Sequence, residues 1–244
     1  MPHPPRYLLS DADLGEEEAL AVADVVRSKW LSVGQQTADF ESEFAEFVGC
    51  GRAIATSSAT ASLHLAMLAL GIGPGDEVLV PSYTFVASVN AIAYVGATPV
   101  FVDIVGPSDL NLDLDDLAAK VSPRTRAVVV VHLAGYLADM NGIMALAEAH
   151  GFAVVEDAAH AVGARYLTPG PYQGCSAGTI GALGCFSFFA NKNLVTGEGG
   201  MTTSDDETLA RAVRLGRSHG MTKTSWDKAT GRAIDYDIHE IGYN

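Results

Sequence analysis

The feature that most constrains the fold is an alternation of short apolar runs with helical stretches after Gly51. The apolar runs lie at 53–56, 78–80, 100–102, 128–131, 153–155, 183–188 and 201–203. Helical patterns lie near 60–70, 84–95, 114–120, 140–150 and 206–215. Continuous β-branched runs separated by helices are typical of strands that are covered on both faces. The sequence therefore predicts an α/β fold with a mostly parallel sheet of about seven strands between helices.

The first fifty residues have a helical pattern. Asp13 can cap a first helix, with Glu16 at the capping-box position. Two sets of apolar residues recur at helical spacing: Leu20, Ala23 and Val26, then Phe40, Phe44 and Phe47. We expect residues 1–50 to form an N-terminal helical segment and residues 51–244 to form one large α/β domain.

Composition narrows the classes of function. The net charge of -14 disfavours a nucleic-acid partner, because phosphate binding needs clustered Lys and Arg. The three cysteines, Cys50, Cys175 and Cys185, show no Cys-x-x-Cys spacing, and the histidines show no metal-ligand spacing. The chain shows neither a signal peptide nor an apolar run long enough to span a bilayer. We expect a cytoplasmic protein with no metal site and no membrane partner.

Polar and aromatic side chains follow four of the expected strands, where each strand ends. They are Ser57, Ser58 and Thr60; Tyr83, Thr84 and Phe85; Asp157 and His160; Ser187 and Lys192. Ligands of open parallel sheets bind beyond the carboxyl ends of the strands. We therefore expect these four groups to meet at one site.

Lys192 gives the chemistry of that site. It is the only lysine between Val121 and Thr222, and it lies between an apolar strand and the Gly-rich turn 197–200. A partly desolvated amine of this kind can act as a nucleophile. Together with Asp157 it supplies the two protein groups that pyridoxal phosphate (PLP) requires, an amine for a Schiff base and a partner for the pyridinium nitrogen. The alternative is a surface lysine in a loop, and for Asp157 an aspartate that caps the next turn.

Other residues could bind the phosphate group and the ring of PLP. The small residues around Ser58 and Thr60 precede a helix whose free N–H groups can bind a phosphate, although Ser58 can equally be an ordinary N-cap. Phe85 can stack on a cofactor ring or fill the core. His160 can lie beside the ring or be structural.

With these residues, the chain resembles the DegT/DnrJ/EryC1/StrS family of sugar aminotransferases, which are PLP enzymes of fold type I. The resemblance covers about Leu14 to Asn244. It is carried by segments 57–61, 73–78, 81–85, 96–100, 156–161, 187–193 and 241–244.

The resemblance implies a role for each matched residue. Lys192 matches the lysine that holds PLP and moves the proton, Asp157 the pyridinium partner, and Phe85 the stacking aromatic. His160 matches a residue beside the ring. The phosphate-binding positions correspond to Ser58, Ala59, Thr60 and Ser187, and Asn244 matches an asparagine that reaches the cofactor phosphate of the neighbouring subunit, which implies a homodimer.

The implied reaction is transfer of an amino group from glutamate or glutamine to a nucleotide-linked keto sugar, for cell-envelope, lipopolysaccharide or antibiotic sugars. In its motifs the chain looks most like the 4-amino-4-deoxy-L-arabinose branch, which acts on a UDP sugar; perosamine-type and other 4-keto-sugar enzymes remain open. Family members continue past the Gly-Tyr-Asn segment into a small C-terminal domain, so we expect a fragment or a truncated gene. Two alternatives stay open: an inactive or regulatory pseudo-subunit, and a PLP-dependent sugar dehydratase, in which a histidine replaces the lysine.

Overall fold

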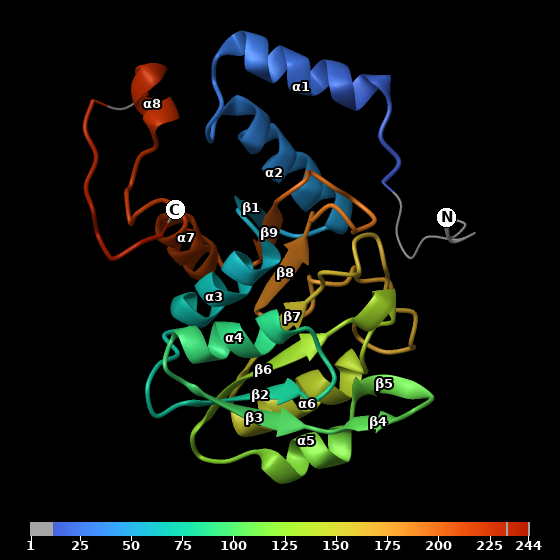
Figure 1. Ribbon diagram of the computed structural model, residues 1–244. Helices are drawn as coiled ribbons and strands as arrows, with labels where there is room; N and C mark the ends of the chain where they lie inside the picture. Colours follow the sequence, from blue (N-terminus) through green and yellow to red (C-terminus); the bar gives the residue numbers. More distant parts are fainter. Residues whose placement is uncertain (1–11, 233, 244) are drawn as a thin grey trace, which may run out of the picture.

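A seven-stranded sheet forms the centre of the computed structural model, which describes residues 12–232 and 234–243 (Figure 1). The strand order is β1-β9-β8-β7-β6-β2-β3. The strands are β1 (Arg52–Thr56), β2 (Glu77–Pro81), β3 (Thr98–Val102), β6 (Thr125–Val131), β7 (Ala153–Asp157), β8 (Leu183–Ser187) and β9 (Gly200–Ser204). Strands β3, β2, β6, β7 and β8 pair in parallel, and β9 is antiparallel to both β8 and β1, so β1 runs in the same direction as those five strands. The predicted fold class is confirmed.

Helices cover both faces of this sheet, as the apolar runs predicted (Figure 1). On one face lie α3 (Ala59–Ala69), α4 (Val86–Tyr94) and α7 (Glu207–Gly216). On the other lie α2 (Gln35–Val48), α5 (Leu114–Lys120) and α6 (Met140–His150). Side chains alternate between the faces along each strand, so Val155 packs with the α3 and α4 side while Val154 packs with the α6 side.

The N-terminal helices differ from the prediction in two respects. Helix α1 (Glu16–Ser28) begins after Gly15, whose backbone N–H donates to Glu18 Oε2 at 2.7 Å, so the expected cap at Asp13 with Glu16 is wrong. The N-cap Gly15 directly precedes the first helical residue, and this is the position that a cap must occupy. The apolar residues of α1 are not buried. In α2 Phe44 packs against Phe186 and Phe188, whereas Phe47 is 56% exposed.

Helix α2 is tied to the open edge of the sheet. The backbone N–H of Ala55, on edge strand β1, donates to Glu41 Oε1 at 2.9 Å, and Arg217 Nη1 donates to Ala55 O at 2.6 Å. Arg217 also forms an ion pair with Glu41. These side chains satisfy backbone groups that an unpaired edge would leave open to another strand.

The sequence did not reveal several short elements. They are the hairpin β4 (Ile104–Gly106) and β5 (Asp109–Leu112), the 3₁₀ turn η1 (Leu133–Gly135) and helix α8 (Ser225–Ala229). Each is too short for a hydrophobic period to develop. No helix within residues 12–232 and 234–243 combines the length and the apolar character needed to cross a membrane.

Candidate active site

A cavity of about 440 Å³ brings the sequence-predicted site residues together. Its lining includes eight of them: Ser58, Ala59, Thr60, Phe85, Asp157, His160, Ser187 and Lys192. They follow strands β1, β2, β7 and β8 or end them, so the carboxyl ends of four strands meet here as expected. The ninth predicted residue, Asn244, lies outside the described residues.

The N-terminus of α3 forms one wall of the cavity. Ser58 is the N-cap, and its Oγ accepts a hydrogen bond from the backbone N–H of Ala61 at 3.1 Å. This use of a lone pair leaves the hydroxyl proton of Ser58 free to be donated to an anion. The N-cap interpretation and the anion-binding interpretation are therefore compatible, because the first N–H groups of a helix attract negative charge.

Asp157 is the carboxylate of the cavity, and it is only 5% exposed. Its Oδ2 accepts a hydrogen bond from Ser88 Oγ at 2.7 Å, and its Oδ1 accepts one from the backbone N–H of Ala159 at 3.2 Å. The local bond to Ala159 is the turn contact expected of a loop aspartate. The donor Ser88 lies on α4, and no sequence pattern predicts this contact.

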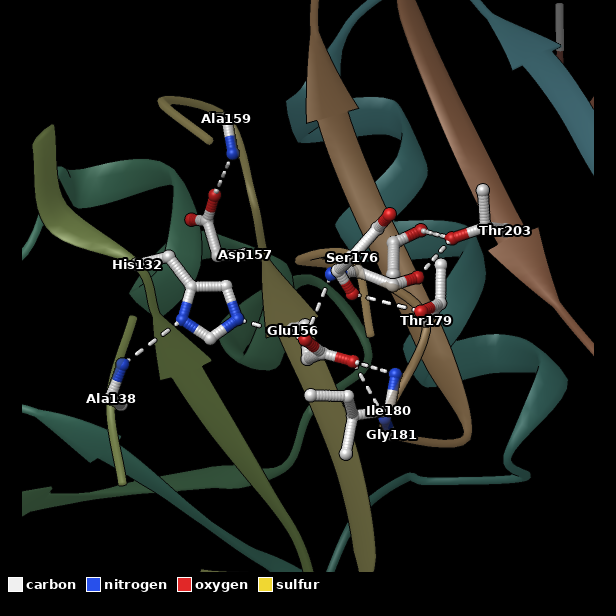
Figure 2. Close-up of polar contacts among 12 residues, drawn as sticks. His132, Ala138, Glu156, Asp157, Ala159, Ser176, Thr179, Ile180, Gly181 and Thr203 are labelled. Atoms are coloured by element: carbon white, nitrogen blue, oxygen red, sulfur yellow. Dashed lines mark hydrogen bonds and ion pairs between the residues drawn. The ribbon is translucent and has the colours of Figure 1, made fainter. Parts of the chain in front are cut away.

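Glu156, the preceding residue, belongs to a separate buried network (Figure 2). Its carboxylate bonds to His132 Nε2 at 2.8 Å and accepts from the backbone N–H groups of Gly178, Ile180 and Gly181 at 2.8, 2.7 and 2.6 Å. Because the backbone N–H of Ala138 donates to His132 Nδ1 at 3.3 Å, Nε2 carries the ring proton and donates it to Glu156.

The charge state of Glu156 follows from these contacts. Complete burial by itself raises the pKa of this carboxyl group, but the hydrogen bonds from His132 and from the backbone N–H groups lower it by more. The net result is a pKa below its ordinary value, so Glu156 is ionised at neutral pH. His132 also lines the cavity, but Glu156 does not, and all four of its donors belong to the protein.

Lys192 lies in the loop after β8, where its backbone N–H donates to Phe189 O at 2.9 Å. Burial lowers the pKa of its amine, while the negative charge of Asp157 acts in the opposite direction. Lys192 in turn contributes, after burial, to lowering the pKa of His160. The charge of Asp157 therefore acts on the pKa of Lys192 and of His160, and the charge of Lys192 acts on the pKa of His160.

His160 and Phe85 complete the predicted set. His160 Nδ1 accepts a hydrogen bond from the backbone N–H of Ala134 at 3.3 Å, which ties it to the 3₁₀ turn η1. Phe85 is the N-cap residue of α4 and is 71% exposed, so it does not fill the core. Its ring lines the cavity and is available for stacking.

The cavity also contains residues that the sequence analysis gave no role. Its remaining lining comprises Leu63, Thr84, Ala87, Val131, His132, Leu133, Ala159, Phe189, Asn191 and Glu198. Thr84 was marked only as a residue after a strand, and no pattern distinguishes the others from core or loop residues. In the part of the chain that the structure describes, no cluster of three or more His, Cys, Asp or Glu side chains could hold a metal ion.

Comparison with known proteins identifies relatives of the chain. It is 48% identical over 231 residues to the spore coat polysaccharide biosynthesis protein SpsC of Bacillus subtilis, covering 94% of this chain and 58% of that protein. It is 45% identical over 218 residues to GDP-perosamine synthase of Caulobacter vibrioides, covering 89% of this chain and 57% of that protein. The chain thus spans less than two thirds of the length of these relatives.

A solved structure has the same fold and bears on the cofactor. The PLP form of sugar aminotransferase Spr1654 from Streptococcus pneumoniae superposes with a TM-score of 0.84 at 29% identity, covering 97% of this chain and 62% of that one. Its PMP form gives a TM-score of 0.85 at 30% identity, covering 97% of this chain and 63% of that one. The predicted cofactor, PLP, is confirmed at the level of the family.

The L-arabinose branch is not supported in particular by these relatives and stays a prediction. At the level of the family the comparison is decisive, because a family model described as "DegT/DnrJ/EryC1/StrS aminotransferase family" matches residues 12–244. The chain belongs to the DegT/DnrJ/EryC1/StrS aminotransferase family.

Proposed function

We propose that this chain carries the PLP site of an aminotransferase that moves an amino group from glutamate or glutamine to a nucleotide-linked keto sugar. One observation carries the proposal: a single cavity is lined by a lysine, a buried carboxylate, an exposed aromatic ring and hydroxyl groups at a helix N-terminus. PLP chemistry uses a group of each kind. The identity of 48% to a polysaccharide biosynthesis protein supports a sugar substrate.

The residues of the cavity fit PLP in charge and shape. The N-terminus of α3, with Ser58, Thr60 and Ser187, offers donors for the phosphate, and Phe85 offers a flat apolar face for the ring. Asp157 would accept a hydrogen bond from the protonated ring nitrogen and so keep the proton on that nitrogen. When bound, PLP supplies an electron sink for the electron pair that remains when the Cα–H proton of the amino donor is removed.

Lys192 has two tasks in this proposal. Its Nζ holds the cofactor at rest, and after its release the same atom moves the proton that leaves the donor Cα. Both tasks need the neutral amine, and burial, which lowers the pKa of Lys192, increases the neutral fraction. The presence of a lysine here disfavours the dehydratase alternative, in which the amine is replaced by an imidazole.

The substrate class is proposed from the relatives. One of them is named for spore coat polysaccharide biosynthesis and another for GDP-perosamine synthesis, and both names concern carbohydrate synthesis. We propose a nucleotide-linked keto sugar as the amino acceptor. A UDP sugar of the L-arabinose branch and a GDP sugar of the perosamine type are the two to compare directly.

The surroundings of the site are proposed by analogy with the family. A second subunit would bring an asparagine equivalent to Asn244 to the cofactor phosphate, and the protein would act as a homodimer in the cytoplasm. The division into a helical segment of residues 1–50 and a PLP-binding domain of residues 51–244 also stays a prediction.

The experiment that tests this function is the amino-donor half-reaction. The purified chain is incubated with PLP and L-glutamate or L-glutamine, and the 2-oxo acid released in a single turnover is quantified. We expect an amount of oxo acid close to the amount of bound PLP, because each cofactor accepts one amino group. A Lys192→Ala variant should release none on the same time scale.

Two outcomes would contradict the proposal. If the chain binds PLP but releases no oxo acid from either donor, the pseudo-subunit alternative replaces the enzyme. If the chain binds no PLP at all, the assignment of the cavity is wrong. Addition of UDP- or GDP-linked keto sugar to the aminated form then tests the acceptor, with the aminated sugar as the product to detect.

A further inference from the structure

Helix α4 contains one buried polar side chain, and it contacts the site. The buried residues of α4 are Ala87, Ser88, Ala91 and Ile92, of which Ser88 alone carries a polar side-chain group. A buried hydroxyl is costly unless it is hydrogen-bonded, and alanine is the better helix former. Packing and helix propensity therefore do not explain a serine at this position, and its hydrogen bonds do.

Ser88 donates one hydrogen bond and accepts another. Ser88 Oγ lies 2.7 Å from Asp157 Oδ2 and 2.9 Å from Thr84 Oγ1. An ionised carboxylate only accepts, so the single hydroxyl proton of Ser88 is donated to Asp157. Ser88 Oγ then accepts a hydrogen bond from the hydroxyl group of Thr84, which itself lines the cavity. Thr84, Ser88 and Asp157 thus form a chain that ends on the carboxylate.

The hydrogen bonds from Thr84 to Ser88 and from Ser88 to Asp157 restrain the Asp157 side chain. The backbone N–H of Ala159 occupies Oδ1 and Ser88 occupies Oδ2, so donors from two different elements restrain both oxygens. Each oxygen keeps a further lone pair. The same first turn of α4 carries Phe85, the aromatic residue of the cavity. A shift of this turn would therefore move the aromatic face and the partner of Asp157 together.

We propose that Ser88 is a positioning residue that holds Asp157 in the orientation needed to bind the ring nitrogen of PLP, with Thr84 as its own hydrogen-bond donor. This inference rests on the proposed function. Ser88 is fully buried and does not line the cavity, so it acts through Asp157 and touches neither cofactor nor substrate.

A double-mutant cycle tests the proposal. PLP dissociation constants are measured for the wild-type chain, the Ser88→Ala variant, the Asp157→Asn variant and the variant that carries both substitutions. We expect Ser88→Ala to weaken PLP binding about tenfold when Asp157 is present and less than about twofold when it is Asn, because residues in one hydrogen-bond network couple. Ser204→Ala is the matched control, since this buried serine also makes two hydrogen bonds, to Ala182 O and Asp206 N–H, away from the cavity.

A spectroscopic readout separates positioning from general structural support. With PLP labelled with ¹⁵N in its ring, the nitrogen signal of the wild-type complex should have the shift of a protonated pyridine. Ser88→Ala should move the signal toward the unprotonated value, whereas Ser204→Ala should leave it in place. The thermal unfolding midpoints of the cofactor-free variants are compared in parallel.

The outcomes are distinct. If the wild-type chain binds PLP but Ser88→Ala has the same effect in both backgrounds, or leaves the nitrogen signal unchanged, the positioning role is overturned and the proposed function stands. If the wild-type chain does not bind PLP, the proposed function fails and this inference fails with it.

Discussion

Glu156 and Asp157 follow one another on β7, and their side chains point to opposite faces of the sheet (Figure 2). Glu156 accepts hydrogen bonds from His132 and three backbone N–H groups, all held inside the protein. Asp157 has two donors, Ser88 and Ala159, and lines the cavity. One carboxylate is saturated and holds loops together, while the other keeps capacity for a ligand. The number of unused lone pairs therefore distinguishes the two carboxylates better than their burial does.

The largest effect that would test this comparison is the loss of the Glu156 side chain. Glu156→Ala leaves a buried imidazole and three backbone N–H groups without their acceptor. We expect the free energy of unfolding to fall by about 3–5 kcal/mol, as for other buried pairs that lose one partner. Urea denaturation measures it, with Glu46→Ala on the exposed side of α2 as the control. Equal stability of the two variants would show that the network contributes nothing.

Asp157→Asn should affect PLP binding rather than the stability of the fold. We expect little loss of stability, because the amide oxygen can still accept a hydrogen bond, but about 10- to 100-fold weaker PLP binding, the size of one hydrogen bond to a charged group. The amino-donor half-reaction should also slow. Absorbance titration with PLP measures the affinity, and Asp39→Asn, at an exposed position of α2, is the control. Wild-type affinity together with normal half-reaction kinetics would refute the role of Asp157.

The pH dependence of the free energy of unfolding tests whether the pKa of Glu156 is lowered in the folded protein. Its pKa in the folded protein is lowered, so its contribution is fully present above the ordinary value of 4.5 and is lost as the pH falls through the folded value. We expect the stability difference between the wild type and Glu156→Gln to be largest near neutral pH and to shrink in acid. Denaturation at a series of pH values measures it; a difference that stays constant into acid would contradict the lowered pKa.

The smallest expected effect concerns Lys192. Burial lowers its pKa from the ordinary value of 10.5, and only Asp157 opposes this shift. We expect Asp157→Asn to lower the pKa of Lys192 further, because an attracting charge is removed, and Glu156→Gln to leave it unchanged. Competitive acetylation of the cofactor-free chain, followed by mass spectrometry across pH, measures the titration. An equal shift in both variants would remove the distinction between the two acids.

The sequence predicted the sheet because β-branched runs between helices have few other solutions. It also predicted that Lys192 and Asp157 lie in one cavity, since residues at the carboxyl ends of parallel strands share one edge of the sheet. It gave no signal for the contact of Glu156 with His132, because they are 24 residues apart and meet only through the pairing of β6 with β7. Ser88 was equally hidden, because a single serine in an apolar helix resembles any small core residue.

The N-terminal helix shows a second limit of sequence patterns. The helical spacing of Leu20 and Val26 predicts an apolar face on this helix, and α1 has one. The spacing does not show what covers that face, and both side chains are exposed. The cap of α1 was misplaced for a related reason. Aspartate is a strong N-cap by its side chain, whereas the observed N-cap, Gly15, acts through its backbone N–H and Glu18.

The most direct test of the central claim is reduction of the PLP-loaded chain with borohydride, followed by peptide mapping. We expect one stable label, on Lys192, and no label in Lys192→Ala, whose fold should remain intact. A label on another lysine would contradict the assignment of Lys192, and a chain that takes up no label at all would contradict the PLP site itself.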